Sequence, residues 1–495
     1  MKNYLLSILY FITSTAISAQ SFTEILGRPT DTSVTMNILF DAPVEIYFEY
    51  GTEPGNFTLH TSTFKCSANE PFVTVFSGLE PDKRYFYHTK YRHQNETDFV
   101  SGEEHYFHTQ RKKGDTFCFT VEADPHPYDK KGYHPLWETA LLNQLKDSAD
   151  FMLDLGDTFG NDHFPFDITS EEVRRLHLNC RPFFGEVCHS APLFLCLGNH
   201  EGESGYYLLQ TPPDNLATWG TIWRNYYYPN PVPGQFYSGN INEERNGIGQ
   251  PANYYAWQWG NALFVVLDVY RYYKSSAKPR GWEWTIGKEQ YNWLKETLEN
   301  SSATFKFVFA HHVSGETRGG IKPSKYYEWG GYESDGETWG FTGKRPGWEM
   351  PVHQLMVKNK VNIFFQGHDH LFAWEQVDGM IYQTVPMPDD SSYQIGISAN
   401  GHAYTGTSMG GSGHLRVTVS PEQIQVDYIL AVLPKDETAI VKNGDVAFSY
   451  AINGDQVTTL SEISRKSFNS SLKINPNPLR NSVERHFKLK KRRVK

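Results

Sequence analysis

The sequence has little of what membrane-spanning and nucleic-acid-coating proteins carry. After its first twenty residues, no apolar run of the 495-residue chain approaches the roughly 20 residues that a bilayer span requires. The net charge is −10 at pH 7, so we expect no basic surface for nucleic acid. The five cysteines have no zinc-finger spacing. The sequence therefore predicts neither a transmembrane segment nor a nucleic-acid-binding protein.

The cysteine count is odd, which leaves at least one thiol unpaired if the protein is exported. Cys118 and Cys196 lie in apolar runs, where cysteine usually packs as a small hydrophobic side chain. Cys180 and Cys188 lie on one segment, and the sequence leaves open whether they form a disulfide.

The chain begins with a segment typical of export. Lys2 precedes the apolar run Leu5–Ile17, and small residues follow that run. The alternative is a membrane anchor, but the run is short for one. We therefore predict a secretory signal peptide over residues 1–20, and a protein that is secreted, periplasmic or bound at the cell surface.

Short β-branched and aromatic runs fill residues 21–110, for example SVTMNILF, VEIYFEYG and RYFYHTKYR. Strands of this length, separated by turn residues, predict a small all-β sandwich. The phrase Gly78-Leu-Glu-Pro-Asp-Lys-Arg-Tyr85 resembles a turn and strand of fibronectin type III modules. We expect a fibronectin III-like domain over this region.

From residue 111 to about 435, near-continuous apolar runs alternate with helix-like stretches such as 136–148 and 288–300. This alternation predicts an α/β domain with a buried sheet. Two long segments rich in Gly, Tyr and Trp, residues 201–260 and 313–350, interrupt the pattern. Two roles for their aromatic side chains are equally consistent with the sequence: a lid over a functional site, or a cover for the edge of the sheet.

The last segment, residues 436–495, contains turn-forming residues and ends in the basic run Lys488–Lys495. Its phrase INPNP, residues 474–478, resembles the start of the C-terminal sorting domain that the type IX secretion machinery recognises. Such domains normally continue for several strands, and this chain stops sooner. Two predictions stay open, a truncated sorting segment and a disordered tail.

Five short motifs rich in His, Asp and Asn each follow an apolar run. In open α/β sheets, sites form where the C-terminal ends of neighbouring strands lie side by side. The first three motifs are each about one strand–helix–strand unit apart, so we expect their side chains to come together at this edge of the sheet. Imidazole, carboxylate and amide donors without thiolate favour zinc, manganese or iron over calcium. The motifs are Asp124-Pro-His126, Gly156-Asp157, Gly198-Asn199-His200-Glu201, His311-His312 and Gly367-His368-Asp369-His370.

A site for two metal ions needs a carboxylate that bridges them, and Asp157, central in motif order, is the natural candidate. Two such ions clamp a phosphoryl group and activate a water, and the metal-bound hydroxide attacks phosphorus in line. His200, next to Asn199, is placed to bind the phosphate or to protonate the leaving alkoxide. These features predict a small phosphorylated substrate.

The ordered set D-x-H, G-D, G-N-H-E, H and G-H-x-H resembles the calcineurin-like metallophosphoesterase superfamily. The preceding β-sandwich makes the chain similar to the purple acid phosphatase branch. This resemblance implies two mixed sheets flanked by helices, and two ions of iron, manganese or zinc. The first ion would be held by Asp124, His126, Asp157 and His370. The second would be held by Asp157, Asn199, His311 and His368.

Other residues near the motifs have open roles. His312 would either support the site or face the substrate, and Arg318, in a Gly-rich stretch, either contacts phosphate or is solvated. Asp369, between two implied ligands, would orient a histidine. His163 has no motif context. The expected substrate contacts are His200, Asn199, His312 and Arg318.

The chain departs from the purple acid phosphatase pattern at two positions. That branch carries a Tyr three residues after the bridging Asp, and the bond of this Tyr to ferric iron gives the colour. Gly160 stands there in this chain, and His126 stands where the branch usually has Gly. We therefore expect a colourless enzyme with a histidine-ligated first ion.

The leading hypothesis is a secreted phosphoesterase that hydrolyses phosphate monoesters, as acid phosphatases do. A phosphodiesterase for nucleotides or lipid headgroups is the first alternative, because many superfamily members with D-x-H motifs are diesterases. An exported binding protein with a vestigial enzyme domain is the second, although the intact ligand set argues against it.

Overall fold

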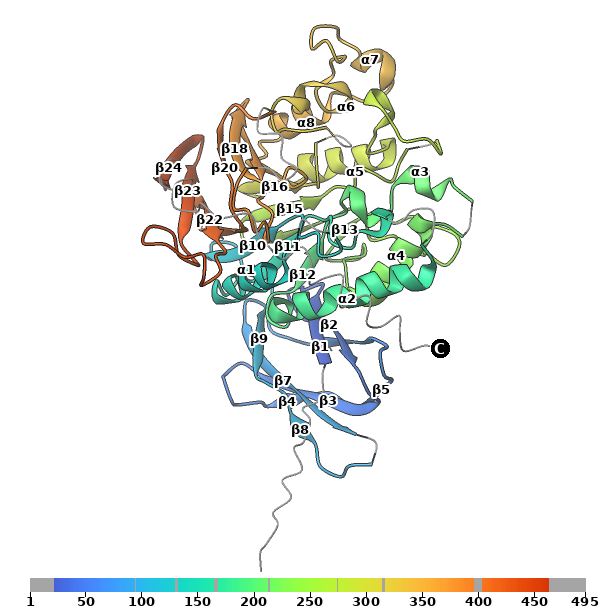
Figure 1. The fold of residues 1–495 in the computed structure, drawn as a ribbon, viewed down its shortest axis with the longest axis vertical. Coiled ribbons are helices and arrows are strands. Elements are labelled where there is room, and N and C mark those ends of the chain that lie inside the picture. The colour runs from blue at the N-terminus through green and yellow to red at the C-terminus, as the bar shows by residue number, and fades with distance from the viewer. Residues whose placement is uncertain are drawn as a thin grey trace, which may run out of the picture.

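The protein is described by a computed structural model that covers most of the chain. Both terminal segments lie outside the described part, so the signal peptide, the sorting phrase and the basic tail stay predictions. In Figure 1 a small all-β region lies below a larger α/β body. The described residues are 22–93, 95–129, 132–163, 168–211, 214–273, 275–313, 317–395 and 403–462.

The N-terminal region is built from two facing sheets around one apolar core. Along β3, buried Val44, Ile46 and Phe48 alternate with half-exposed residues, as a strand with one face on a core requires. The expected all-β region is confirmed, and its likeness to fibronectin III stays a prediction. One layer contains β1 (Phe22–Gly27), β2 (Ser33–Phe40) and β6 (Phe72–Ser77). The other contains β3 (Val44–Gly51), β4 (Leu59–His60), β5 (Phe64–Cys66), β7 (Arg84–His93), β8 (Val100–Ser101) and β9 (His105–His108).

The first of these layers continues into the sheet of the α/β body. Gly27 of β1 pairs with Leu193 of β12, and among the described residues the sheet order is β24-β23-β22-β21-β10-β11-β12-β1-β2-β6. Strands β10, β11 and β12 are parallel and mostly buried. These strands are β10 (Phe117–Glu122), β11 (Phe151–Asp154), β12 (Leu193–Leu195), β21 (Gly413–Val419), β22 (Gln423–Leu430), β23 (Val446–Asn453) and β24 (Gln456–Glu462).

The large sheet extends past the domain boundary expected near residue 435. β23 pairs antiparallel with β22, and β24 pairs with β23, so residues 446–462 of the expected tail form sheet. Phe448 and Tyr450 explain this, because both are buried in the core of the body and give β23 an apolar face.

A second sheet packs on the first through aromatic side chains. The ring of Phe119 on β10 lies 5.1 Å from that of Phe264 on β15 and 5.5 Å from that of Phe307 on β16. Its order is β13-β14-β15-β16-β17-β19-β18-β20. The strands are β13 (Ser238–Gly239), β14 (Tyr255–Trp259), β15 (Ala262–Val266), β16 (Phe305–Phe309), β17 (Ile363–Gln366), β18 (Phe372–Val377), β19 (Met380–Thr384) and β20 (Thr407–Met409).

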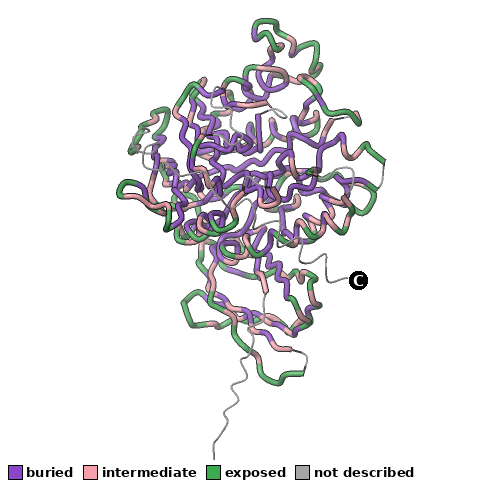
Figure 2. The backbone as a smooth tube through the Cα atoms, in the orientation of Figure 1, coloured by how far each residue is buried: buried purple, intermediate pink, exposed green. Residues whose placement is uncertain are grey.

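Helices cover the outer face of each sheet, and the buried strands form the centre of the body in Figure 2. The expected two mixed sheets flanked by helices are thus confirmed. α1 (His134–Lys146), α2 (Ser170–Cys188) and α4 (Leu216–Tyr227) pack on the large sheet, and α5 (Lys288–Glu299), α6 (Tyr327–Gly330) and α8 (Val352–Lys358) on the second. The remaining short helices are α3 (Gly205–Leu208), α7 (Phe341–Lys344), η1 (Asn161–His163), η2 (Asn199–Glu201), η3 (Gly281–Glu283) and η4 (Pro323–Lys325). None of the described helices is long and apolar enough to cross a membrane.

A buried arginine joins α2 to the N-terminal layer. Arg181 is fully buried, and its Nη1 donates hydrogen bonds to Asn37 Oδ1 on β2 at 2.9 Å and to the carbonyl oxygen of Tyr227 on α4. Its Nε donates to Thr23 Oγ1 on β1 at 3.1 Å. The guanidinium therefore fixes three elements at one point of the seam.

The cysteines form no disulfide, and all five are free thiols. The pairing of Cys180 with Cys188 that the sequence left open is wrong, because both lie on α2. Eight residues of helix separate them by about 12 Å along the axis, whereas a disulfide needs Cα atoms within about 7 Å.

The two long aromatic-rich segments contribute to the core as well as to the surface. Trp257 and Trp259 lie on β14 and are buried, and Trp329 is buried and donates a hydrogen bond from Nε1 to the Tyr382 hydroxyl at 3.0 Å. Tyr226 and Trp339 are exposed. The buried tryptophans cover the second sheet, so the lid interpretation is left to the exposed rings.

Candidate metal centre

The predicted ligands come from the ends of strands in both sheets. Asp124 and His126 follow β10, Asp157 follows β11, and Asn199 begins η2 after β12. From the second sheet, His311 follows β16, and His368 and His370 follow β17. Because both sheets end at this edge, residues up to 246 positions apart meet in one site, as expected for the C-terminal ends of strands in open sheets.

Several of these residues hold a backbone conformation that side chains normally avoid. The φ angles are 61° at Asp124, 42° at His126, 60° at Asp157, 70° at His368 and 54° at His370. Left-handed backbone at a residue with a side chain costs free energy, and such strain gathers at functional sites where the surrounding structure holds it. The strain marks this edge as a site independently of the residue types.

One buried carboxylate supports the turns that carry Asp157 and Asn199. Glu201 accepts hydrogen bonds from the backbone N–H of Asp157 at 2.9 Å, of Thr158 at 2.7 Å and of Gly198. At Gly156, a side chain would overlap the backbone of Gly198, so glycine is required there. The two turns are therefore locked against each other.

The first cluster of donor atoms comprises Asp124, His126 and His370, all buried. His126 Nε2 lies 3.0 Å from His370 Nε2, and Asp124 Oδ1 lies 3.6 Å from His370 Nε2 and 3.9 Å from His126 Nε2. Adjacent ligands at about 2.1 Å from a metal ion are about 3.0 Å apart at a right angle, so this spacing suits one ion.

The second cluster comprises Asp157, His311 and His368, also buried. Asp157 Oδ2 lies 3.2 Å from His311 Nε2 and 3.8 Å from His126 Nε2 of the first cluster. One carboxylate oxygen thus faces both clusters, which is the position a bridging ligand needs. The ligand roles of these residues, and of Asn199 beside them, are a proposal that the geometry supports.

Unsatisfied buried atoms indicate that the clusters suit cations. Among the described residues, Asp124 Oδ1, Asn199 Oδ1 and His368 Nε2 are buried without a hydrogen-bond partner. Such atoms are rare because an unpaired buried polar group costs about 1–3 kcal/mol. All three atoms carry lone pairs that could bind a cation, and Asp124 and His368 belong to the two clusters, so two metal ions fit the residues present.

The charges at the site support the same conclusion. Burial lowers the pKa of His311, but attraction to Asp157 and Asp124 outweighs burial and raises that pKa to about 10. Burial is also the main reason why the pKa of Asp124 is raised to about 7. Without metal ions, the carboxylate and imidazole groups of the site therefore bind protons with the same lone pairs that would bind cations.

The calcineurin-like phosphoesterase family model matches residues 119–372, which include all the proposed ligands from Asp124 to His370. The chain belongs to the calcineurin-like phosphoesterase family. It is accordingly a metal-dependent phosphoric ester hydrolase of a family that uses a dinuclear metal centre. Which two metals this chain binds stays a prediction. A comparison with curated proteins gave no match.

Two solved structures share the fold of this phosphoesterase. The structure of PhoD matches with a TM-score of 0.61 and 18% identity, covering 89% of this chain and 92% of PhoD. Purple acid phosphatase PPD1 from yellow lupin (Lupinus luteus) seeds matches with a TM-score of 0.58 and 14% identity, covering 88% and 75%. At these identities the likeness shows a shared architecture, which includes the N-terminal all-β region.

Tyr128 occupies the space next to Gly160, where the purple acid phosphatase pattern has its Tyr. A side chain on Gly160 would overlap the ring of Tyr128. The Tyr128 hydroxyl lies 2.7 Å from His126 Nδ1 and donates to the carbonyl oxygen of Asp157 at 3.3 Å. His126 Nδ1–H therefore donates to the hydroxyl, which leaves the Nε2 lone pair facing the first cluster.

An aspartate that sequence reasoning missed orients His200. His200 Nδ1 lies 2.7 Å from Asp162 Oδ1 on η1, and its Nε2 lies 3.9 Å from Asp157 Oδ2. The backbone N–H of His200 donates to Asp157 Oδ1 at 2.7 Å. Asp162 holds Nδ1–H, so Nε2 is directed to the metal centre, where a proton could be given to a leaving group.

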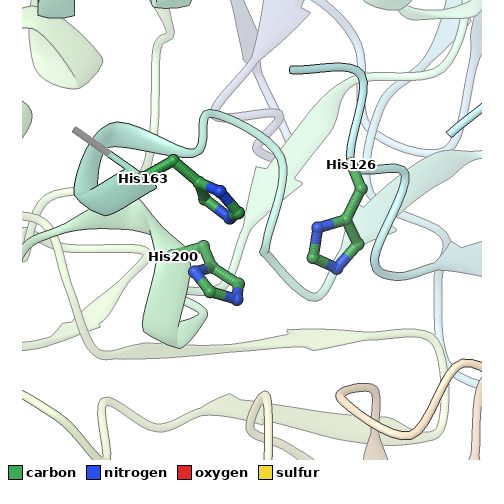
Figure 3. A group of neighbouring side chains, drawn as sticks. All are labelled: His126, His163 and His200. Carbon is green, nitrogen blue, oxygen red and sulfur yellow. The ribbon is translucent and has the colours of Figure 1, made fainter. Parts of the chain in front are cut away.

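A third histidine also lies at this side of the site. The rings of His163 and His200 are side by side with centroids 4.6 Å apart, and His126 lies across from them (Figure 3). Sequence reasoning set His163 aside because it follows the Gly-Asp motif without a motif of its own. The signal that could have drawn attention to Asp162 and His163 is their place directly after the Gly156–Gly160 turn.

The Gly-His-Asp-His turn is held by its central aspartate. Fully buried Asp369 accepts hydrogen bonds from Arg318 Nη1 at 3.0 Å, from the backbone N–H of Gly319 at 2.7 Å and from the Tyr404 hydroxyl. Arg318 Nη1 also donates to the carbonyl oxygen of His368. Arg318 therefore supports the ligand turn, and its expected phosphate contact stays a proposal.

The ring of His312 packs beside that of His368, with centroids 5.0 Å apart. Its side chain is fully buried, with Nε2 3.1 Å from the carbonyl oxygen of Gly319 and Nδ1 3.4 Å from Thr317 Oγ1. Burial lowers its pKa to about 4, so the ring is neutral. Both ring nitrogens lie near atoms of Thr317 and Gly319, which fits the alternative of a supporting residue, and a substrate contact stays a proposal.

Proposed function

We propose that this phosphoesterase acts outside the cytoplasm and hydrolyses phosphate monoesters. The observation that carries the proposal is the convergence of two donor clusters on Asp157, with the Asp162–His200 pair directed at the same point. The fold that the chain shares with a purple acid phosphatase supports the monoester preference. Export rests on the signal-like segment of residues 1–20.

The residues have distinct roles in this proposal. Asp124, His126 and His370 would hold one ion, and Asn199, His311 and His368 would hold the other, with Asp157 shared between them. When bound, the two ions polarise the phosphoryl group and lower the pKa of a water molecule. The side chain of His200 then binds the phosphate or donates a proton from Nε2 to the departing alkoxide.

The supporting residues keep this geometry before substrate arrives. Glu201 locks the Asp157 and Asn199 turns, and Tyr128 fixes the ring of His126. Asp369 fixes the turn between His368 and His370. Preorganised ligands of this kind leave little rearrangement to be made during the reaction.

The direct test is hydrolysis of an aryl phosphate monoester and an aryl phosphate diester by the purified protein with Mn²⁺ or Zn²⁺. We expect the kcat/KM for the monoester to exceed that for the diester by at least about tenfold, which is about 1.4 kcal/mol of transition-state discrimination. A preference for the diester would refute the monoester assignment and leave the metal centre intact.

Phosphodiesterase activity is the second candidate. It is favoured by the histidine at position 126, because the purple acid phosphatase pattern usually has glycine there and many superfamily diesterases have D-x-H motifs. Turnover of neither ester, together with elemental analysis that finds no bound metal, would instead favour the exported binding protein.

A further inference from the structure

Outside the dinuclear centre, a pair of neighbouring carboxylates is buried with oxygen atoms that have no hydrogen-bond partner among the described residues. Asp389 lies after β19, and its side chain is fully buried. Among the described residues, neither Asp389 Oδ1 nor Oδ2 has a hydrogen-bond partner, and Oδ2 of the adjacent, fully buried Asp390 has none either. A buried carboxylate with two unpaired oxygens costs several kcal/mol unless a proton or a cation neutralises it.

Backbone oxygen atoms converge on the same place. A Cβ at Gly132 would lie within 2.7 Å of three oxygens, namely Asp389 Oδ2 and the carbonyl oxygens of Pro125 and His126. These oxygens belong to two distant parts of the chain, which the backbone hydrogen bond from Tyr133 N–H to the Asp389 carbonyl oxygen joins at 3.2 Å. A side chain at Gly132 would overlap this cradle of oxygens, so glycine is required for their close approach.

The charges around the cradle are negative. The carboxylates of Glu122, Asp390 and Asp129 all place negative charge near Asp389. A single proton on Asp389 would serve only one of its two oxygens. The carbonyl oxygen of His126 accepts a hydrogen bond from the backbone N–H of Asp129 at 3.3 Å and keeps its second lone pair for a cation. A cation would satisfy the carboxylate and both carbonyl oxygens together.

The donor set differs in kind from that of the dinuclear centre. The cradle offers carboxylate and carbonyl oxygens and no nitrogen, which is the set that calcium prefers at about 2.3–2.6 Å. Calcium takes about six to eight oxygens, so water molecules would complete its shell on the side of Gly132 and Tyr133, which are half-exposed.

We propose that Asp389 and the carbonyl oxygens of Pro125 and His126 form a third metal site, which binds Ca²⁺. Such an ion joins residues 125–126 to Asp389. Since the carbonyl oxygen of His126 is one donor, the ion holds the left-handed backbone of a residue whose ring faces the dinuclear centre. The ion has a structural role and takes no part in the reaction.

The test measures calcium bound per chain after equilibrium dialysis of the full protein against Ca²⁺. Asp157→Asn removes the bridging charge of the dinuclear centre and should still bind one Ca²⁺ per chain. Asp389→Asn in that background should lose this calcium, and the rise in Tm that calcium causes should vanish with it. Asp455→Asn, at an exposed turn between β23 and β24, is the matched control and should keep both.

Equal calcium binding with and without Asp389→Asn would overturn the proposal, as would absence of bound calcium in the Asp157→Asn protein. A crystal of the unmodified protein grown with Ca²⁺ decides the matter if Asp389→Asn does not fold. We expect an anomalous difference peak between Asp389 and the Pro125 and His126 carbonyl oxygens. Density for calcium confined to the dinuclear centre contradicts the site and leaves the phosphoesterase function untouched.

Discussion

The metal centre and the seam between α2 and the N-terminal layer both bury polar groups, but they treat them in opposite ways. At the seam, Arg181 is surrounded by acceptors from β1, β2 and α4. At the metal centre, Asp124 Oδ1 and His368 Nε2 are buried without a partner on strained backbone. The first arrangement stabilises the fold, whereas the second keeps lone pairs ready for ions.

This contrast separates activity from stability. A substitution at the metal centre should lower turnover far more than the free energy of unfolding, because strained backbone and unpaired atoms do not stabilise the fold. A substitution at the seam should do the reverse. Four variants test the separation, beginning with the largest expected effect.

Asp157→Asn should lower kcat/KM for an aryl phosphate by about 10³-fold or more, because the carboxylate that faces both clusters is lost. The Asn side chain still accepts the hydrogen bond from the His200 N–H, so the stability that the metal-free protein loses should be limited to the attraction between Asp157 and His311. Enzyme kinetics and urea unfolding measure both quantities. Retained turnover would refute the bridging role.

Arg181→Met should destabilise the protein by about 3 kcal/mol, because the buried acceptors Asn37 Oδ1 and Tyr227 O lose their donor. The midpoint of urea unfolding measures this loss. Arg175→Met, an exposed position on the same helix, should change stability by less than about 0.5 kcal/mol. A drop in kcat of folded Arg181→Met protein would contradict the prediction that the seam affects stability and not activity.

Asp162→Asn should lower kcat by about 10- to 100-fold with little change in KM, because the His200 ring loses the carboxylate that orients it. The pH profile of kcat should change as well, since Asp162 supports the proton on His200. Unchanged kcat and an unchanged pH profile would show that Asp162 is only a structural residue of η1.

Tyr128→Phe should weaken the binding of one of the two ions by about tenfold, which metal titration measures. The ring that fills the space at Gly160 remains, and only the hydroxyl that fixes His126 is lost. Phe22→Leu, distant from the centre in the N-terminal core, serves as the comparison variant and should bind both ions as the unmodified protein does.

Much of the fold could be predicted from the sequence because apolar runs and motifs are local signals. The all-β region, the α/β body and the placement of the five motifs at the ends of strands follow from such patterns. The pairing of β23 with β22 could not be predicted, because turn residues hide the apolar face that Phe448 and Tyr450 provide.

The supporting residues of the site were harder to predict than the ligands. Asp162 and Tyr128 act through contacts that only the folded chain creates, and neither belongs to a recurring motif. Asp389 lies more than 250 residues from the loop it faces, and nothing in its local sequence distinguishes it from a solvated aspartate. Conversely, His312 stands in a motif and is nevertheless buried within its loop.

The most direct test of the dinuclear centre is a titration of the metal-free protein with Mn²⁺ or Zn²⁺, with bound metal and aryl phosphate hydrolysis followed together. We predict that activity rises until two ions per chain are bound by the Asp157 clusters, and that Asp157→Asn never reaches this plateau. Full activity with a single bound ion, or two bound ions without hydrolysis of either ester, would contradict the assignment.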